Sequence, residues 1–291
     1  MRGKYLNMLV NAFDNTRGIK GFGKHWFVDG WDGDDGFDGS EEMPFKTMAV
    51  AFAALSSGDT IHLRGRIQEQ INAPQDIFDV TITGTPNRPR HGTADGVQQG
   101  YPAQWNPLAT ATATPNLTLR EQGWIIENIL FDAPDAAAAI KLSRTELAAA
   151  MDASHATIRN CRFVDGGTGI EDAGGHFNVK VEDCVFQSLT NGITCSSTSI
   201  AVPTQWQILN NEFLGNTSDI IISLNYSTIK GNRFHMQSAI VNTVYNSAQG
   251  DYNCVVDNYF CDDATAIGTS CTGGTNDIWM NQCNDAVKYG S

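Results

Sequence analysis

One short frame recurs between residues 126 and 260 and constrains the fold more than any other feature of the chain. In each copy an aliphatic residue is followed two positions later by Asn, Asp or Gly, and five positions later by Phe. The Phe positions lie 32, 23, 27, 21 and 26 residues apart. A fixed signature with a period in the twenties indicates a solenoid. The copies begin at Ile126, Ile158, Val181, Ile208, Ile229 and Val255, and a degraded copy follows at Ile278, Met280 and Cys283.

Each copy is too short for a helix and rich in Ile, Val, Phe and Asn, which predicts short strands joined by tight corners. Asn, Asp and Gly tolerate the left-handed backbone that such a corner needs. Leucine-rich repeats share this period but need a Leu-dense register that is absent here. The sequence therefore predicts an all-β fold, a single-stranded right-handed parallel β-helix. Successive coils then stack equivalent residues into ladders, with Phe inside and Asn or Asp at the corner.

The composition fits one elongated domain and excludes several classes of function. A content of 41% hydrophobic and 18% charged residues is typical of a folded, turn-rich chain. The net charge of −13 argues against a nucleic-acid-binding protein, and neither a membrane span nor a signal peptide is apparent. Seven Cys without CxxC spacing indicate no metal centre and no disulfide framework. Cys161 and Cys184 share one place in adjacent copies, so we expect buried, reduced thiols there.

The N-terminal part of the chain departs from the repeat. Residues 1–24 lack periodicity and are expected to form an irregular arm, followed by a β-helix domain over residues 25–291. For residues 25–65 the sequence predicts a strand, a loop, a helix, a turn and a second strand. Pro44 is expected to start the helix and Gly58 to end it. Such a cap covers strand edges that would otherwise recruit other chains. A loop insertion at residues 84–122 and a short helix near residues 145–151 interrupt the coils.

Two parts of the chain resemble known proteins. The cap of pectin-lyase-like right-handed β-helix proteins is similar to five stretches: Phe27-Val28-Asp29, Asp35-Gly36, Pro44-Phe45-Lys46-Thr47, Ala51-Phe52-Ala53-Ala54 and Gly58-Asp59-Thr60-Ile61. This resemblance implies the fold but leaves function open, since the superfamily includes polysaccharide lyases, glycosidases, epimerases, tailspikes and non-catalytic virion proteins. The segment from Ile82 through Trp124 to Ala133 resembles β-helix proteins encoded in tailed-bacteriophage genomes. That resemblance implies a virion protein and a homotrimer.

Carboxylates on the coils are the candidates for glycoside hydrolysis. The best cluster is Asp165, Glu171 and Asp172, with His176 on the same turn, because two carboxylates at a suitable separation can run acid/base cleavage. Asp262-Asp263 is a second possible pair, but the other motifs of a polygalacturonase are missing. Solvated corner residues are the alternative reading of these carboxylates.

Basic residues on the rungs are the candidates for a lyase, which needs a base beside a neutralised acidic sugar. They are scattered among Asp and Glu on an acidic chain, which makes a poor site for polyuronates. The residues are Arg159, Arg162, Lys180, Lys230, Arg233 and His235.

An acidic, Gly-rich loop near the N-terminus is a candidate calcium site, because Ca²⁺ prefers hard oxygen ligands. The spacing does not fit an EF-hand loop, and turns of the Gly-Asp kind also explain the composition. No other cofactor is expected. The five candidate ligands are Asp29, Asp32, Asp34, Asp35 and Asp38.

Three function classes remain open. The first is a non-catalytic bacteriophage virion structural protein, either capsid decoration (cement) or a tail-associated module, located in virions assembled in the host cytoplasm. It would be a homotrimer that contacts other virion proteins, such as the major capsid protein, and binds glycans. The alternative is a polysaccharide-degrading enzyme, a tailspike-like glycoside hydrolase or lyase. The third is a carbohydrate-binding module without turnover. Its sugar-stacking aromatic residues would be Trp206, Tyr226, Tyr245 and Tyr252.

Overall fold

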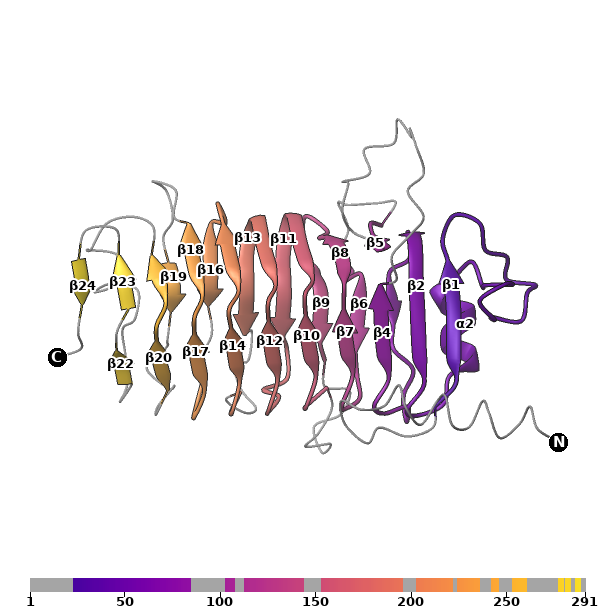
Figure 1. Cartoon of the computed structure of the whole chain (residues 1–291), viewed down its shortest axis with the longest axis horizontal. Coiled ribbons are helices and arrows are strands. Elements are labelled where there is room, and N and C mark those ends of the chain that lie inside the picture. The colour runs from indigo at the N-terminus through magenta and orange to yellow at the C-terminus, as the bar shows by residue number, and fades with distance from the viewer. Residues whose placement is uncertain are drawn as a thin grey trace.

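The structure is an elongated stack of coils with a helical cap at the N-terminal end and the last strands at the other end (Figure 1). Every described strand pairing is parallel except that of the last two strands. The predicted right-handed parallel β-helix is therefore confirmed. The computed structural model describes residues 23–84, 103–107, 113–143, 153–195, 203–221, 224–235, 242–245, 253–260, 277–279, 281–283 and 286–288.

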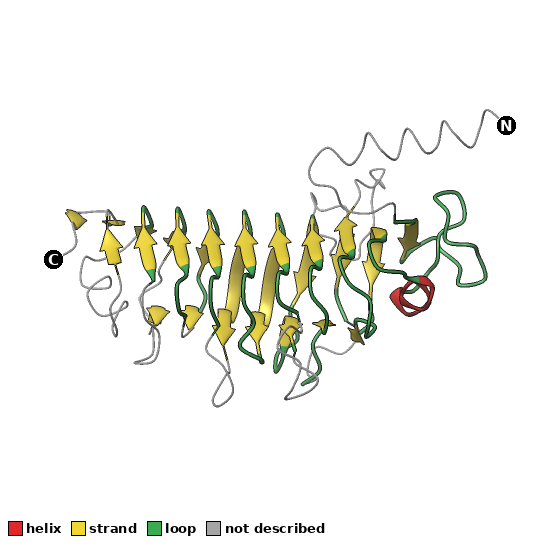
Figure 2. Ribbon diagram, turned by 90° about the horizontal axis from the view of Figure 1, so that it is seen from below, coloured by secondary structure: helices red, strands yellow, loops and turns green. Residues whose placement is uncertain are grey.

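The strands form three columns that run along the stack (Figures 1 and 2). The first column contains the start of β2 together with β1 (His25–Asp29), β4 (Thr81–Gly84), β7 (Ile125–Glu127), β10 (Thr157–Arg159), β12 (Lys180–Glu182), β14 (Gln207–Leu209), β17 (Thr228–Lys230), β20 (Cys254–Val256) and β22 (Asp277–Trp279). The second column contains the end of β2 (Thr60–Ile67), β5 (Ala103–Trp105), β8 (Ile129–Asp132), β15 (Glu212–Leu214), β18 (Arg233–His235), β21 (Tyr259–Phe260), β23 (Asn281–Cys283) and β24 (Ala286–Lys288). The third column contains β3 (Ile71–Asn72), β6 (Leu117–Leu119), β9 (Ala138–Leu142), β16 (Ser218–Ile221) and β19 (Asn242–Tyr245). Two long strands, β11 (Arg162–Asp172) and β13 (Val185–Cys195), run through the second and third columns.

The predicted Phe ladder fills the interior behind the second column. Neighbouring rings stack with centroids 4.8 to 5.3 Å apart, and Trp105 extends the stack toward the cap. Each such aromatic pair contributes about 0.5–1.5 kcal/mol beyond the burial of its area. The rings that form the ladder are Phe131, Phe163, Phe186, Phe213, Phe234 and Phe260, all fully buried.

The predicted corner lies between the first and second columns. All six residues that the repeat places there have φ between 49° and 69°, namely Asn128, Asn160, Asp183, Asn210, Gly231 and Asp257. The next residue of the coil points inward and forms a buried column, in which the sequence analysis expected the two Cys but not the three Asn: Cys161, Cys184, Asn211, Asn232 and Asn258. The two thiols are free and buried as predicted, and burial raises the pKa of Cys184 well above its usual value.

The cap contains one short helix, α2 (Met48–Ala54), whose buried face includes Met48 and Phe52. Thr47 is its N-cap residue, and the Glu69 carboxylate accepts the N–H groups of Met48 and Ala49 at 2.6 and 3.0 Å. The expectation that Pro44 starts the helix is wrong, because Phe45 first forms a parallel bridge with Val28.

The other end of the cap helix also differs from the expectation. The helix ends at Leu55, and Gly58, with φ 87°, begins the first corner instead of ending the helix. Several predictions fall outside the described residues: the arm at 1–22, most of the 84–122 loop, the helix at 145–151 and Asp262-Asp263. Within the described part, no helix is long and apolar enough to cross a membrane.

Candidate functional site

A second left-handed residue stands in each coil just before the first column. From the first coil to the sixth, the backbone N–H of this residue donates to a carbonyl oxygen of the next coil, so these residues stack in register. Sequence reasoning missed this ladder because its residue types vary from coil to coil. We call it the outer corner ladder. Its members are Gly58, Asp79, Gly123, His155, Asn178, Gln205 and Tyr226, with φ between 52° and 87°.

Three members of the outer corner ladder line an open groove of about 440 Å³ on the outer surface. They are Asn178, Gln205 and Tyr226, from three successive coils, and the Tyr226 side chain is 63% exposed. Among the described residues, no charged side chain lines the groove. Its other lining residues are Trp206, Gln207, Leu209 and Thr228.

The side chains of this groove match the chemistry of a sugar. Amide groups of Asn and Gln both donate and accept hydrogen bonds, as the hydroxyl group of Thr does, and sugar hydroxyl groups need both kinds of partner. An exposed aromatic ring offers an apolar face with a polar tip. Two lysines of the first column are paired with carboxylates, since Lys180 lies 2.6 Å from Glu182 and Lys230 lies 3.5 Å from Asp257.

Of the aromatic residues predicted to stack on sugars, Tyr226 is exposed but Trp206 is not. Trp206 is fully buried, and its Nε1 donates to the carbonyl oxygen of His176 at 2.9 Å. The prediction for Trp206 is wrong because the residue after each outer-corner position turns into the interior. The side chain of Tyr245 and the whole of Tyr252 lie outside the described residues.

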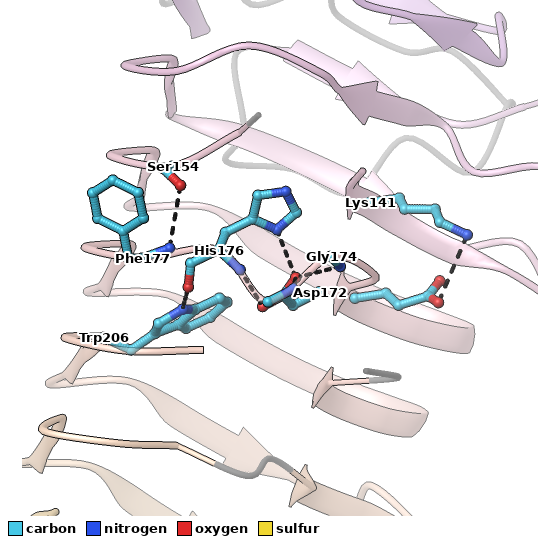
Figure 3. A network of polar contacts seen from close by, with 9 residues as sticks. Lys141, Ser154, Asp172, Gly174, His176, Phe177 and Trp206 are labelled. Atoms are coloured by element: carbon cyan, nitrogen blue, oxygen red, sulfur yellow. Dashed lines mark hydrogen bonds and ion pairs between the residues drawn. The ribbon is translucent and has the colours of Figure 1, made fainter. Parts of the chain in front are cut away.

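The predicted carboxylate cluster separates into different surroundings (Figure 3). Asp172 is fully buried and accepts the N–H groups of Gly174, Gly175 and His176, while His176 Nδ1 lies 2.6 Å from its Oδ1. Glu171 lies 3.7 Å from the ammonium group of Lys141. Asp172 and His176 therefore anchor a turn, and no contact in the structure supports their catalytic role, which stays a prediction.

Asp165, the fourth member, lies beside two carboxylates of the preceding coil instead. Its neighbour Val164 pairs in register with Asp132, and the Gly167 N–H donates to the carbonyl oxygen of Pro134. Burial raises the pKa of Asp132, the charges of Asp165 and Asp135 raise it further, and Arg66 opposes them. Sequence reasoning missed Asp132 and Asp135 because only the register of the coils brings them to Asp165.

The acidic loop does not gather its carboxylates around one point. Asp29 accepts the N–H groups of Trp31 and Asp32 and pairs with Arg64 at 2.8 Å. Within the described residues, no three His, Cys, Asp or Glu side chains are grouped to hold a metal ion. The geometry therefore supports the interpretation of this loop as a series of turns, and it gives no support to a calcium site. The remaining carboxylates bind local backbone N–H groups: Asp34 that of Gly36, Asp35 those of Lys46 and Thr47, and Asp38 that of Ser40.

The outward basic residues have acidic or polar partners. Arg159 lies 2.6 Å from Glu127, and His235 lies 2.9 Å from Glu212. Arg162 donates to Gln187. These contacts leave no concentration of positive charge on the described rungs of the kind that an acidic sugar would need.

With the fold and the site described, the chain can be compared with known proteins. Residues 112–289 match the family model described as NosD, periplasmic copper-binding protein. This match spans more than half of the chain. The protein belongs to the NosD family. That family consists of parallel β-helix proteins, and the predicted pectin-lyase-like superfamily is confirmed with it. Among curated proteins, none matches this sequence.

Several solved structures are similar to this NosD-family chain at low sequence identity. A PL6 alginate lyase in complex with a trisaccharide has 15% identity and a TM-score of 0.44, over 88% of this chain and 59% of the lyase. A mutant tailspike protein of E. coli bacteriophage HK620, in complex with a pentasaccharide, has 14% identity and a TM-score of 0.43, over 96% of this chain and 56% of the tailspike. XylC in complex with xylose has 10% identity and a TM-score of 0.43, over 91% and 84% of the two chains. The chain thus spans about three-fifths of the length of the alginate lyase.

Among the described residues of the matched segment, no group of side chains forms a ligand set for the copper of the family description. Copper sites in proteins combine several imidazole, thiolate or thioether ligands. In the described part of residues 112–289, the His side chains have other partners nearby: His155 contacts Asn178, His176 contacts Asp172, and His235 contacts Glu212. We therefore derive no role of this segment from copper.

Proposed function

We propose that this NosD-family protein is a non-catalytic β-helix that binds a glycan in the groove of Asn178, Gln205 and Tyr226. One observation carries the proposal: three successive coils place polar or aromatic side chains outward from left-handed backbone. For residues other than Gly, Asn and Asp this backbone costs about 1–2 kcal/mol. Gln205 and Tyr226 adopt this backbone at exposed positions, where packing in the core does not offset the strain. A surface that presents side chains at such a cost fits a binding site.

The groove favours an uncharged sugar polymer that lies along the axis of the solenoid. The spacing of successive coils, seen in the 4.8 Å separation of the Phe rings, is comparable with the length of one pyranose ring in an extended chain. Each coil can then offer one amide or aromatic contact to one sugar. The net charge of −13 and the paired lysines disfavour a polyuronate by repulsion.

The test is affinity electrophoresis of the protein in gels that contain neutral or acidic polysaccharides, followed by calorimetry on the best ligand. We expect retardation by a neutral polysaccharide, retained in Tyr226→Phe and weakened about ten-fold, equivalent to about 1.4 kcal/mol, in Tyr226→Gly. Gly suits the left-handed backbone, so the second variant removes the ring without straining the corner. Binding by Tyr226→Gly equal to that of the wild type, or no retardation on any neutral glycan, contradicts the proposal.

A second candidate function, cleavage of a polysaccharide, is favoured by Asp132 and Asp165, whose charges interact across two neighbouring coils. A carboxyl group whose pKa is raised by burial and by a neighbouring carboxylate is the kind of group that general acid catalysis in glycosidases uses. A reducing-end assay with wild type, Asp132→Asn and Asp165→Asn tests it. Product release that both substitutions reduce at least a hundred-fold supports this candidate, and release unaffected by both excludes this pair.

We also propose that this protein is a homotrimeric structural protein of a bacteriophage virion. It would contact other virion proteins, such as the major capsid protein. The similarity of residues 82–133 to tailed-phage β-helix proteins supports it. Size-exclusion chromatography with light scattering tests it. A mass three times that of the chain is the expected result, and a monomer at every concentration contradicts the trimer.

A further inference from the structure

His155 and Asn178 are neighbours in the outer corner ladder, and a side-chain hydrogen bond joins them. The Nδ1 atom of His155 lies 2.8 Å from the Nδ2 atom of Asn178. The imidazole also packs edge-on against the Phe177 ring, with centroids 4.9 Å apart and planes 78° apart. The Phe177 N–H donates to Ser154 Oγ at 3.2 Å, which ties the two coils together beside these rings (Figure 3). The exposed His155 ring therefore has a defined orientation.

The glycan groove lies on the far side of Asn178 from His155. Asn178 is the first residue along the chain that lines the groove, and the other lining residues come from the following coils. His155 stands on the preceding coil and does not line the groove. The amide atom of Asn178 that points away from His155 therefore faces the groove. Within the described residues the Asn178 side chain forms no other hydrogen bond, so a ligand can reach this atom.

The charge of His155 determines which amide atom faces the groove. An amide nitrogen donates and has no lone pair to accept with, so the neutral ring accepts at Nδ1 and carries its proton on Nε2. Asn178 then presents Oδ1, an acceptor, to the groove. A charged imidazole carries hydrogens on both nitrogens, so its Nδ1–H would face the amide N–H. A half-turn of the amide removes this conflict by placing Oδ1 at His155 and Nδ2, a donor, in the groove.

We propose that His155 is a positioning residue of the glycan groove and makes its choice of ligand depend on pH through the amide of Asn178. This role depends on the proposed binding of a glycan in the groove. With neutral His155, the groove offers an acceptor to sugar hydroxyl groups. With charged His155, it offers a donor beside a positive charge, and both changes favour a sugar that carries a carboxylate.

The charged residues on the elements next to His155 do not replace this contact. Lys180 lies 2.6 Å from Glu182, and Arg159 lies 2.6 Å from Glu127. Within the described residues, none of these neighbours forms an ion pair with His155. Protonation of His155 therefore acts first on its bond to Asn178. The neighbouring charged residues are Asp79, Arg120, Glu121, Arg159 and Lys180.

Nuclear magnetic resonance of the whole chain, labelled with nitrogen-15 at His and Asn, tests the coupling without a glycan. Histidine is the side chain that changes its charge between pH 5 and 8, which sets the range to examine. At the upper end we expect the His155 proton on Nε2. On acidification the side-chain amide resonances of Asn178 should move with those of His155, at one midpoint. A proton on Nδ1 at the upper end, or an Asn178 amide that does not follow His155, overturns the inference.

Affinity electrophoresis at the two ends of this pH range tests the consequence for ligand choice. The gels contain hydroxyethyl cellulose, or another neutral polysaccharide that retards the protein more, and the carboxymethyl derivative of the same backbone. In the wild type, acidification should shift the ratio of the two affinities about ten-fold toward the carboxymethyl polymer. His155→Asn keeps a residue that tolerates left-handed backbone and should show no such shift. Asn178→Gly keeps the charge of His155 without the amide and should show a smaller one.

The matched control is His235→Gln, which removes a histidine that contacts Glu212 on another strand. It should shift the ratio of affinities as the wild type does. An equal shift in the wild type and His155→Asn overturns the inference and leaves the groove in place. Retardation by no neutral polysaccharide contradicts the glycan groove itself, whereas the resonances of His155 and Asn178 still test their coupling. Near-ultraviolet circular dichroism checks that each variant remains folded.

Discussion

At the scale of single residues, the left-handed positions divide into two kinds. Fourteen described non-glycine residues have positive φ, and nine of them are Asn or Asp, whose short polar side chains tolerate it. Three of the five exceptions, His155, Gln205 and Tyr226, fall in the outer corner ladder. Residue choice at the corner between the first and second columns therefore follows backbone preference, whereas three of the seven members of the outer corner ladder oppose it.

Tyr226 should separate function from stability. Replacing it with Gly removes a strained left-handed side chain, whereas Ala keeps the strain, so Tyr226→Gly should be about 1 kcal/mol more stable than Tyr226→Ala. Chemical denaturation of the two variants measures this difference. Both should lose glycan affinity equally. Equal stability of the two variants contradicts the strain argued for this position.

Asp219 should make the stability of the solenoid depend on pH. Its side chain is 1% exposed, Oδ1 accepts from Asn216, and Oδ2 has no hydrogen-bond partner among the described residues. Burial raises the pKa of Asp219 to about 7, against a small opposing effect of the Asn216 hydrogen bond. The folded state thus holds a proton that the unfolded state releases near pH 4, so this contribution is complete below pH 4 and is lost as the pH rises through 7.

The matching experiment compares the wild type with Asp219→Asn by thermal unfolding at pH 5 and pH 8. At about 1.4 kcal/mol per pKa unit, the lost contribution is at most about 4 kcal/mol. The variant should gain stability over the wild type on going from pH 5 to pH 8. Asp183→Asn, an exposed corner carboxylate, is the control and should show no such gain. Parallel pH profiles of the wild type and Asp219→Asn would show that Asp219 does not titrate in this range.

At the scale of elements, hydrogen bonds of buried amide side chains join successive coils in addition to strand pairing. The Asn232 side chain donates to Ile208 O and accepts the Asn211 N–H, and it also bonds to the amides of Asn211 and Asn258. Asn232→Ala leaves several of these groups buried without a partner, each at a cost of about 1–3 kcal/mol.

We therefore expect Asn232→Ala to destabilise the protein by at least about 3 kcal/mol in urea unfolding. Asn210→Gly is the matched control, since Asn210 is an exposed left-handed residue of the same turn and Gly adopts that backbone easily. This control should change stability by less than about 1 kcal/mol. A similar loss in both variants would mean that the buried amides contribute no more than the corner itself.

The repeat predicted the elements well because the core requires identical residues at each coil. Phe163, Asn160 and Ile158 lie where the frame places them, since a stacked interior tolerates little change in shape. The groove was not predictable in this way. Asn178, Gln205 and Tyr226 share no residue type, and only the register shows that they are neighbours. The same holds for Asp132, whose partner Asp165 lies on the next coil.

At the scale of the whole molecule, we propose a solenoid that binds a glycan on its outer surface and does not cleave it. The fold was predictable from one period, but the candidate active site was not. Proximity in sequence suggested that Asp172 and His176 face a substrate, whereas the structure buries both beneath a turn. A linear pattern shows which residues share a turn but does not show which of them face solvent.

The most direct test follows binding and product release in one experiment. Wild type, Tyr226→Gly and Asp132→Asn are incubated with each polysaccharide of a neutral and acidic panel, and bound protein and released reducing ends are measured together. We expect that the wild type and Asp132→Asn bind a neutral glycan equally, that Tyr226→Gly binds it about ten-fold more weakly, and that none of the three releases product. Release of sugar by the wild type that is lost in Asp132→Asn would contradict this expectation and make the protein an enzyme.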